Sequence, residues 1–190
     1  MKRVAALTAL LAAAVFAAGC PKFQKPALVV FSDPLSAEQH AALGAAHERE
    51  GNLARALEEY AVALKQDPKN LVALTGLGNI ALAQKKWKTA ERYYQRALAV
   101  SPDNPVAWNN LAMARLGGGD VKSALAAADR AVSLDPRDPR LLETRAEVKT
   151  AAGDAEGAKA DLDAAKIICA ERGQEPALKD TCERMRKACD

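Results

Sequence analysis

The sequence predicts an all-α protein built as a solenoid of helix-turn-helix repeats, and three observations predict it. First, the stretch 71–104 recurs along the chain with a period of 34 residues. Second, the recurring positions carry small and apolar residues, with a proline near the end of the unit. Third, alanine is very frequent while aromatic residues make up only 4% of the chain, a composition that suits closely packed helices. In such an array each unit buries its apolar face on its neighbours.

Six positions carry the repeat at a fixed phase. In the central unit they are Leu77, Gly78, Ala90, Tyr94, Ala97 and Pro102. A shift of 34 residues toward the N-terminus gives Leu43, Gly44, Ala56, Tyr60, Ala63 and Pro68. The opposite shift gives Leu111, Ala112, Ala124, Ala128, Ala131 and Pro136. This pattern resembles the tetratricopeptide repeat (TPR). The resemblance implies an array over 37–172, with three clear repeats (37–70, 71–104 and 105–138) and a degenerate fourth (139–172).

The first element is a leader over residues 1–19. Two basic residues precede a 15-residue apolar run, Val4–Ala18, which is typical of a secretory signal peptide and short for a membrane span. The ending Ala17-Ala18-Gly19-Cys20 resembles the lipobox of bacterial lipoproteins, although Ala17 stands where leucine is most frequent. The resemblance implies that Cys20 becomes the mature N-terminus and carries acyl chains such as palmitate. The alternative is ordinary signal cleavage, which leaves a soluble periplasmic protein.

The second element, residues 20–36, is the lipidated cysteine followed by a tether. Pro21 stands where an aspartate would favour the inner membrane, so the sorting pattern of such lipoproteins implies the outer membrane, with the protein facing the periplasm. Three prolines and the absence of a helical period predict an extended segment. Its apolar run, Ala27–Phe31, either packs against the first repeat or adds to a groove or sheet edge of a partner.

Caps and helix breakers place the helices of the array. Ser36 and Gln39 predict a capping box before a helix over 37–50, and a second helix over 53–66 ends before Pro68. The next two units follow the same plan, with turns near residues 85–86 and 117–120. The fourth repeat has Arg145 at an otherwise apolar position and lacks the final proline, which suits the end of an array. A capping helix over 177–189 is expected within the last segment, 173–190.

In TPR arrays the first helix of each repeat lines a concave groove that holds a peptide or a helix of a partner. The corresponding positions here are three and four residues apart, so each set shares one helical face. The lysine and arginine pairs of the carboxylate-clamp subgroup are missing from them, so capture of a C-terminal carboxylate is not expected. Binding through a convex or edge surface stays open as the alternative. The predicted groove residues are Glu48, Thr75, Asn79, Leu82, Asn109, Met113, Leu116, Glu143 and Glu147.

Three cysteines near the C-terminus suggest a disulfide, because an exported protein meets an oxidising compartment. Cys182 and Cys189 are seven residues apart on one face of the last predicted helix. If the chain turns near Gly173, Cys182 lies closer to Cys169 than Cys189 does. We therefore predict Cys169–Cys182, with Cys169–Cys189 as the rival, and the remaining cysteine is free or pairs between chains.

Nothing in the sequence predicts catalysis, a cofactor, a metal site or a small-molecule substrate. The motifs G-x-S-x-G, H-E-x-x-H and the P-loop are absent. His40 and His47 occupy positions that are aromatic in the repeat pattern, and a third metal ligand is missing, so packing is the expected role. The 27 basic and 24 acidic residues form no basic stripe, which argues against a nucleic-acid partner.

These features predict a membrane-anchored scaffold lipoprotein of the bacterial envelope, which is not an enzyme and binds an envelope protein or peptide in its groove. The chain is similar to small TPR lipoproteins that act as pilotins for the secretin rings of type IV pili. That similarity implies a role in pilus or secretin biogenesis. Two alternatives stay open: an adaptor that recruits peptidoglycan hydrolases or proteases, and a self-associating structural envelope protein.

Overall fold

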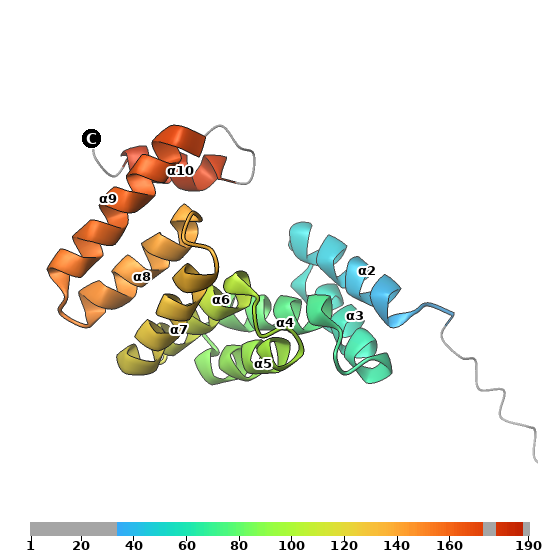
Figure 1. The fold of residues 1–190 in the computed structure, drawn as a ribbon. Coiled ribbons are helices and arrows are strands. Elements are labelled where there is room, and N and C mark those ends of the chain that lie inside the picture. Colours follow the sequence, from blue (N-terminus) through green and yellow to red (C-terminus); the bar gives the residue numbers. More distant parts are fainter. Residues whose placement is uncertain (1–33, 173–177, 188–190) are drawn as a thin grey trace, which may run out of the picture. The chain divides into compact units, whose positions relative to one another are not determined.

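The computed structural model describes residues 34–172 and 178–187, the last three of these by their helical backbone alone (Figure 1). The chain divides into two compact units, Met1–Pro34 and Leu35–Asp190, and the account below concerns the second. The expected leader, Cys20, nearly all of the tether and Cys189 therefore lie outside the described residues. Within the described ranges there is no strand, and none of the helices has the length and apolar character needed to cross a membrane.

Nine helices make up the described ranges, arranged as four helix pairs and a shorter last helix (Figure 1). The pairs are α2 (Ala37–Arg49) with α3 (Leu53–Gln66), α4 (Leu71–Ala83) with α5 (Trp87–Val100), α6 (Pro105–Gly117) with α7 (Val121–Leu134), and α8 (Pro139–Ala151) with α9 (Ala155–Arg172). The last helix is α10 (Lys179–Lys187). The fold is thus all-α, and its packing is that of a TPR solenoid.

Local chemistry sets where the helices begin and end. Ser36 caps α2 in a capping box, in which the Gln39 backbone N–H donates to the Ser36 hydroxyl and the Gln39 side chain accepts from the Ser36 N–H. Asn70 and Asn104 cap α4 and α6 with their side-chain oxygens. Helix α9 is 18 residues long, against 13 or 14 in the helices before it. The proline that follows α3, α5 and α7 is replaced by Ala170 there, so nothing ends α9 early.

The helices form two layers. The first helices of successive pairs contact one another, α2 with α4, α4 with α6 and α6 with α8. Within the described ranges, α3, α5 and α7 contact only first helices and never each other. The first helices are therefore the closer-packed, inner layer of the array, and the second helices form the outer layer.

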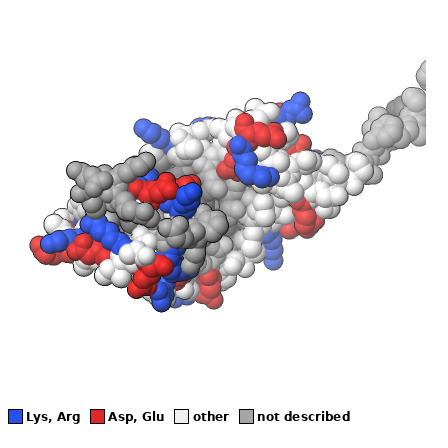
Figure 2. Space-filling view, turned by 90° about the horizontal axis from the view of Figure 1, so that it is seen from above, with Lys and Arg blue, Asp and Glu red and all other residues white. Residues whose placement is uncertain are grey.

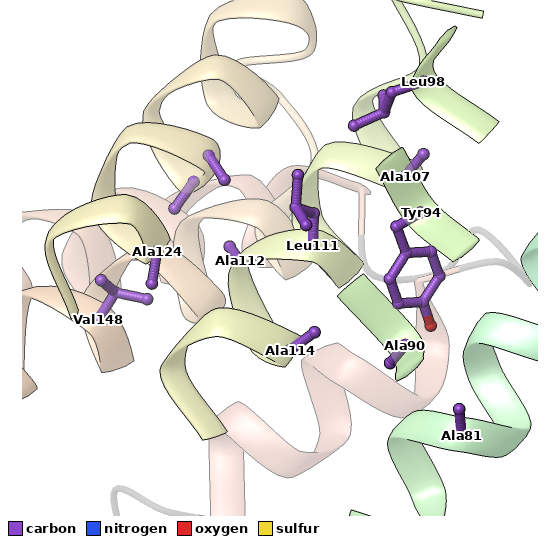
Figure 3. Close-up of a cluster of buried hydrophobic side chains, with 12 residues drawn as sticks. Ala81, Ala90, Tyr94, Leu98, Ala107, Leu111, Ala112, Ala114, Ala124 and Val148 are labelled. Carbon is purple, nitrogen blue, oxygen red and sulfur yellow. The ribbon is translucent and has the colours of Figure 1, made fainter. Parts of the chain in front are cut away.

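Small residues let the inner layer pack closely around buried tyrosines. Tyr60 is 1% exposed and lies between Gly44 of its own repeat and Gly76 of the next. A Cβ atom at Gly44 would lie 2.6 Å from the Tyr60 ring, and one at Gly76 would overlap it. Tyr94 is fully buried, and Figure 3 shows it in a cluster with Ala90, Ala107 and Leu111. Each repeat thus contributes side chains to a core that continues into the next.

The fourth repeat replaces part of this apolar packing by a charged cluster. Asp161 is 5% exposed and accepts from Arg145 Nε at 2.8 Å and from Arg145 Nη2 at 2.6 Å. Lys149 Nζ lies 2.8 Å from the same carboxylate. Burial alone would raise the pKa of Asp161, but the hydrogen bonds from Arg145 and Lys149 outweigh it and lower this pKa. The cluster therefore joins α8 to α9 through charge.

The end of the array is closed by a disulfide between Cys169 of α9 and Cys182 of α10. Both cysteines are buried in a cluster that also contains Leu142, Ile168 and Leu178. Helix α10 contacts both α8 and α9 (Figure 1). The last helix thus covers the fourth repeat.

Candidate partner-binding groove

A groove of about 620 Å³ opens in the inner layer between α4, α6 and α8. It is mainly apolar, with two amides and one carboxylate. It is lined by Asn79, Leu82, Ala83, Trp87, Asn110, Met113, Leu116, Gly117 and Glu147. A hollow of this size, with few polar groups, is typical of ligand sites in proteins.

The structure brings five of the nine predicted groove residues together in this hollow. They are Asn79, Leu82, Met113, Leu116 and Glu147. Met113 is 38% exposed, so its side chain is available to a partner. The other four predicted residues lie outside this lining, and their hydrogen bonds explain what they do.

Asn79 has a fixed orientation at the floor of the groove. Its Oδ1 accepts from the Tyr94 hydroxyl at 2.9 Å and from Asn110 Nδ2 at 3.2 Å. Burial raises the pKa of Tyr94, so the phenol remains a donor. No acceptor among the described residues holds the Asn79 Nδ2 atom. The amide is thus locked by α5 and α6 while its N–H groups stay available to a bound segment.

Thr75 and Asn109 are turned toward the protein. The Thr75 hydroxyl donates to the Leu71 carbonyl at 2.8 Å, so its own helix uses it. Asn109 is only 8% exposed, and its Nδ2 lies 3.9 Å from the Met113 sulfur. Its Oδ1 is buried and accepts no hydrogen bond from the described residues. These two side chains do not contribute to the lining of the groove.

The three predicted acids differ in their partners. Glu48 accepts from the Tyr60 hydroxyl at 2.7 Å. Glu143 is paired with Arg184 of α10 at 3.0 Å. Glu147 has no cation or donor bound to it among the described residues. Burial raises the pKa of Glu147, Glu143 raises it further, and Arg184 opposes them. Glu147 is thus the acid in the lining, and no described lysine or arginine pairs with it directly.

Trp87 and Asn110 line the groove although the sequence did not predict them there. Trp87 begins α5, an outer helix, and its ring packs over Gly117 across the turn. A pattern that assigns the groove to first helices alone cannot find a side chain that reaches it from a second helix. The repeat register assigns Asn109, and not its neighbour Asn110, to the groove face. The hydrogen bond from Asn110 to Asn79 shows that Asn110 lies on that face.

His40 packs inside the first repeat, and the described residues offer no metal site. His40 is 4% exposed and its Nδ1 lies 2.7 Å from Glu59 Oε2, so it packs between α2 and α3. The described residues contain no group of three or more histidine, cysteine or acidic side chains placed to hold a metal ion. Figure 2 shows acidic and basic side chains side by side over one face of the molecule.

Comparison with known proteins supports the repeat assignment. Residues 75–139 match the family model of the tetratricopeptide repeat. Among solved structures, residues 41 to the end of MamA from Desulfovibrio magneticus RS-1 are 23% identical, with 74% of this chain and 78% of that chain covered and a TM-score of 0.66. Another crystal structure of MamA is 20% identical over 75% of this chain and 83% of that chain, with a TM-score of 0.68.

A chain of a different assembly has the same fold. A chain of the APC/C hetero-tetramer Cut9–Hcn1 is 20% identical over 80% of this chain and 30% of that chain, with a TM-score of 0.66. No curated protein sequence matches significantly. At these identities the solved structures show the fold alone. The described array therefore has the fold of a TPR solenoid, and its residues 75–139 match the tetratricopeptide repeat model.

Proposed function

We propose that this protein is a scaffold that holds a segment of a protein partner in the groove between α4, α6 and α8. One observation carries the proposal: the locked Asn79 amide lies beside an exposed apolar surface that includes Met113. A fixed amide can bond the main chain of an extended segment, while apolar walls take its side chains. TPR proteins are generally non-enzymatic interaction modules, and none of the comparisons points to catalysis.

The proposal includes a place in the cell. We propose that Cys20 is lipidated and anchors the scaffold to the outer membrane of a bacterial envelope, facing the periplasm. The leader Val4–Ala18 and the sequence Ala17-Ala18-Gly19-Cys20 support this. The disulfide Cys169–Cys182 supports it independently, because such bonds persist in oxidising compartments. Incorporation of labelled palmitate is expected in the wild-type chain and not in Cys20→Ala. Equal labelling of both chains would contradict lipidation at Cys20.

The role in the envelope is assembly of a protein complex. The resemblance to pilotin-like TPR lipoproteins favours biogenesis of a pilus secretin. If the protein is instead an adaptor for hydrolases or proteases, the experiment below recovers a soluble enzyme. If it is a self-associating structural protein, the experiment recovers the protein itself.

Crosslinked affinity purification of the tagged full chain from its own envelope tests the groove. The groove variant is Ala83→Trp/Met113→Ala, because both side chains are exposed in the lining. The matched control is Ala99→Trp/Val100→Ala, which makes the same Ala→Trp change and a smaller apolar truncation at exposed positions of the outer helix α5. A partner recovered with wild type and control, and lost with the groove variant, supports the proposal. A partner retained by all three would place binding on another surface.

A further inference from the structure

The apolar part of the groove accommodates a large side chain. Met113 and Leu116 are three residues apart on α6, so they share one helical face. Leu82 and Trp87 complete the walls. Ala83 is small and exposed, so it leaves the space open between these walls. A volume of about 620 Å³ exceeds that of one side chain, so several residues of a bound segment enter the groove. Met113 can adapt its shape to an aliphatic or aromatic occupant.

The same groove carries on one side an acid that has no direct ion-pair partner among the described residues. Glu147 of α8 lies in the lining, and neither lysine nor arginine belongs to that lining. The nearest acid of the same helix face, Glu143, is already paired with Arg184 at 3.0 Å. Arg184 therefore pairs directly with Glu143, and it acts on Glu147 only through a longer-range attraction. Partners place opposite charges against each other, so a cation of the bound segment is the complement of Glu147.

The Asn79 amide determines which side of the groove the main chain of the segment faces. Asn79 lies on α4 and Glu147 on α8, with Met113 and Asn110 on α6 between them. The free N–H groups of Asn79 suit a main-chain carbonyl, and they cannot bind a cation. A segment that spans the groove thus presents its main chain to α4 and its charged side chain to α8.

Resting on the proposed function, we infer that the partner segment is apolar and basic: a large apolar residue on Met113 and Leu116, with a lysine or arginine on Glu147 within a few residues of it. The groove discriminates against acidic segments because Glu147 repels them. One acid and two apolar residues on neighbouring inner helices thus determine which partner chemistry fits the groove.

Selection from a random dodecapeptide library tests the inference with the full chain, purified in detergent. Wild type is expected to enrich peptides in which a lysine or arginine lies within a few residues of a leucine, isoleucine, methionine or phenylalanine, on either side. The affinity of the best peptide is then measured for three variants. Glu147→Lys is expected to weaken it at least about tenfold and Glu147→Gln by less, while Glu58→Lys, the same change at an exposed position of the outer helix α3, leaves it unchanged.

The outcomes separate this inference from the function on which it rests. Enriched peptides that lack basic residues, or that bind Glu147→Lys as tightly as wild type, overturn the inference. If Ala83→Trp/Met113→Ala still abolishes their binding, groove binding itself survives. If no peptide is enriched, or if that groove variant binds like wild type, the proposed function fails and the inference fails with it. A library selected on Glu147→Lys is expected to yield acidic peptides instead.

Discussion

Single residues of this array carry two kinds of constraint, packing and charge. Gly76 illustrates the first, because Tyr60 of the preceding repeat occupies the space of a side chain there. We expect Gly76→Ala to lower the free energy of unfolding by about 2 kcal/mol, since overpacking a tight core forces side chains or backbone to move. Urea denaturation measures it. Gly118→Ala is the control: its Cβ would have its nearest neighbour at 3.4 Å and φ is −79°, so a loss as large as for Gly76→Ala would refute the packing argument.

Glu147 illustrates the second constraint, since the folded state disfavours its charge. Burial, then Glu143, raises its pKa above the ordinary 4.5, against the opposing effect of Arg184. The folded chain thus binds the proton more tightly than the unfolded chain. The resulting stability is present below pH 4.5 and is lost as the pH rises through the raised pKa. We expect Glu147→Gln to raise the melting temperature at pH 7 and to leave it unchanged at pH 4, as scanning calorimetry would show. A lower melting temperature at pH 7 would contradict this.

A carboxyl group whose charged form the fold disfavours is consistent with a role in binding. The sequence alone placed Glu147, Asn79 and Met113 on the inner face, because a helical period and a repeat register determine which side chains share a face. It could not predict that Asn109 is buried or that Thr75 bonds its own helix. Those outcomes depend on side-chain rotamers and on neighbours from other repeats, which no register contains.

At the scale of helices, the pairing of α8 with α9 depends on charge. Asp161 has a lowered pKa in the folded chain, so its contribution is present above its ordinary pKa of 3.8 and is lost as the pH falls through the lowered value. We expect Asp161→Asn to cost about 2 kcal/mol at pH 7, because hydrogen bonds from Arg145 and Lys149 to a carboxylate are lost. The cost should shrink below pH 3.8. Asp163→Asn, an exposed site on the same helix, should have little effect in the same denaturation series.

The attachment of α10 gives a second test at this scale. The disulfide closes a loop with a sequence separation of 13, so Cys182→Ser is expected to cost about 3 kcal/mol locally. Amide hydrogen exchange should accelerate in α10, while α2–α5 keep their protection, because repeats contact only their neighbours. Uniformly faster exchange throughout the array would show instead that the bond supports the whole fold.

The helix boundaries were largely predictable, and the reasons are local. Ser36 with Gln39, and the prolines after α3 and α5, act within a few residues of their own position. The length of α9 also follows from a local feature, the alanine at position 170. The groove volume and the position of Trp87 result from contacts between repeats, so the linear pattern could not give them.

On the scale of the whole array, each junction between repeats is built differently. Tyr60 extends from the first repeat into a gap left by Gly76. The residue 34 positions later is Asn110, whose amide bonds Asn79, the same side chain that accepts from the Tyr94 hydroxyl. If the second repeat were deleted, Tyr60 would face Asn110 where it now has Gly76. The repeats look alike, but they are not interchangeable, because each junction depends on a particular pair of residues. An insertion or exchange of repeats must therefore also transfer the glycine or amide that the neighbouring repeat contacts.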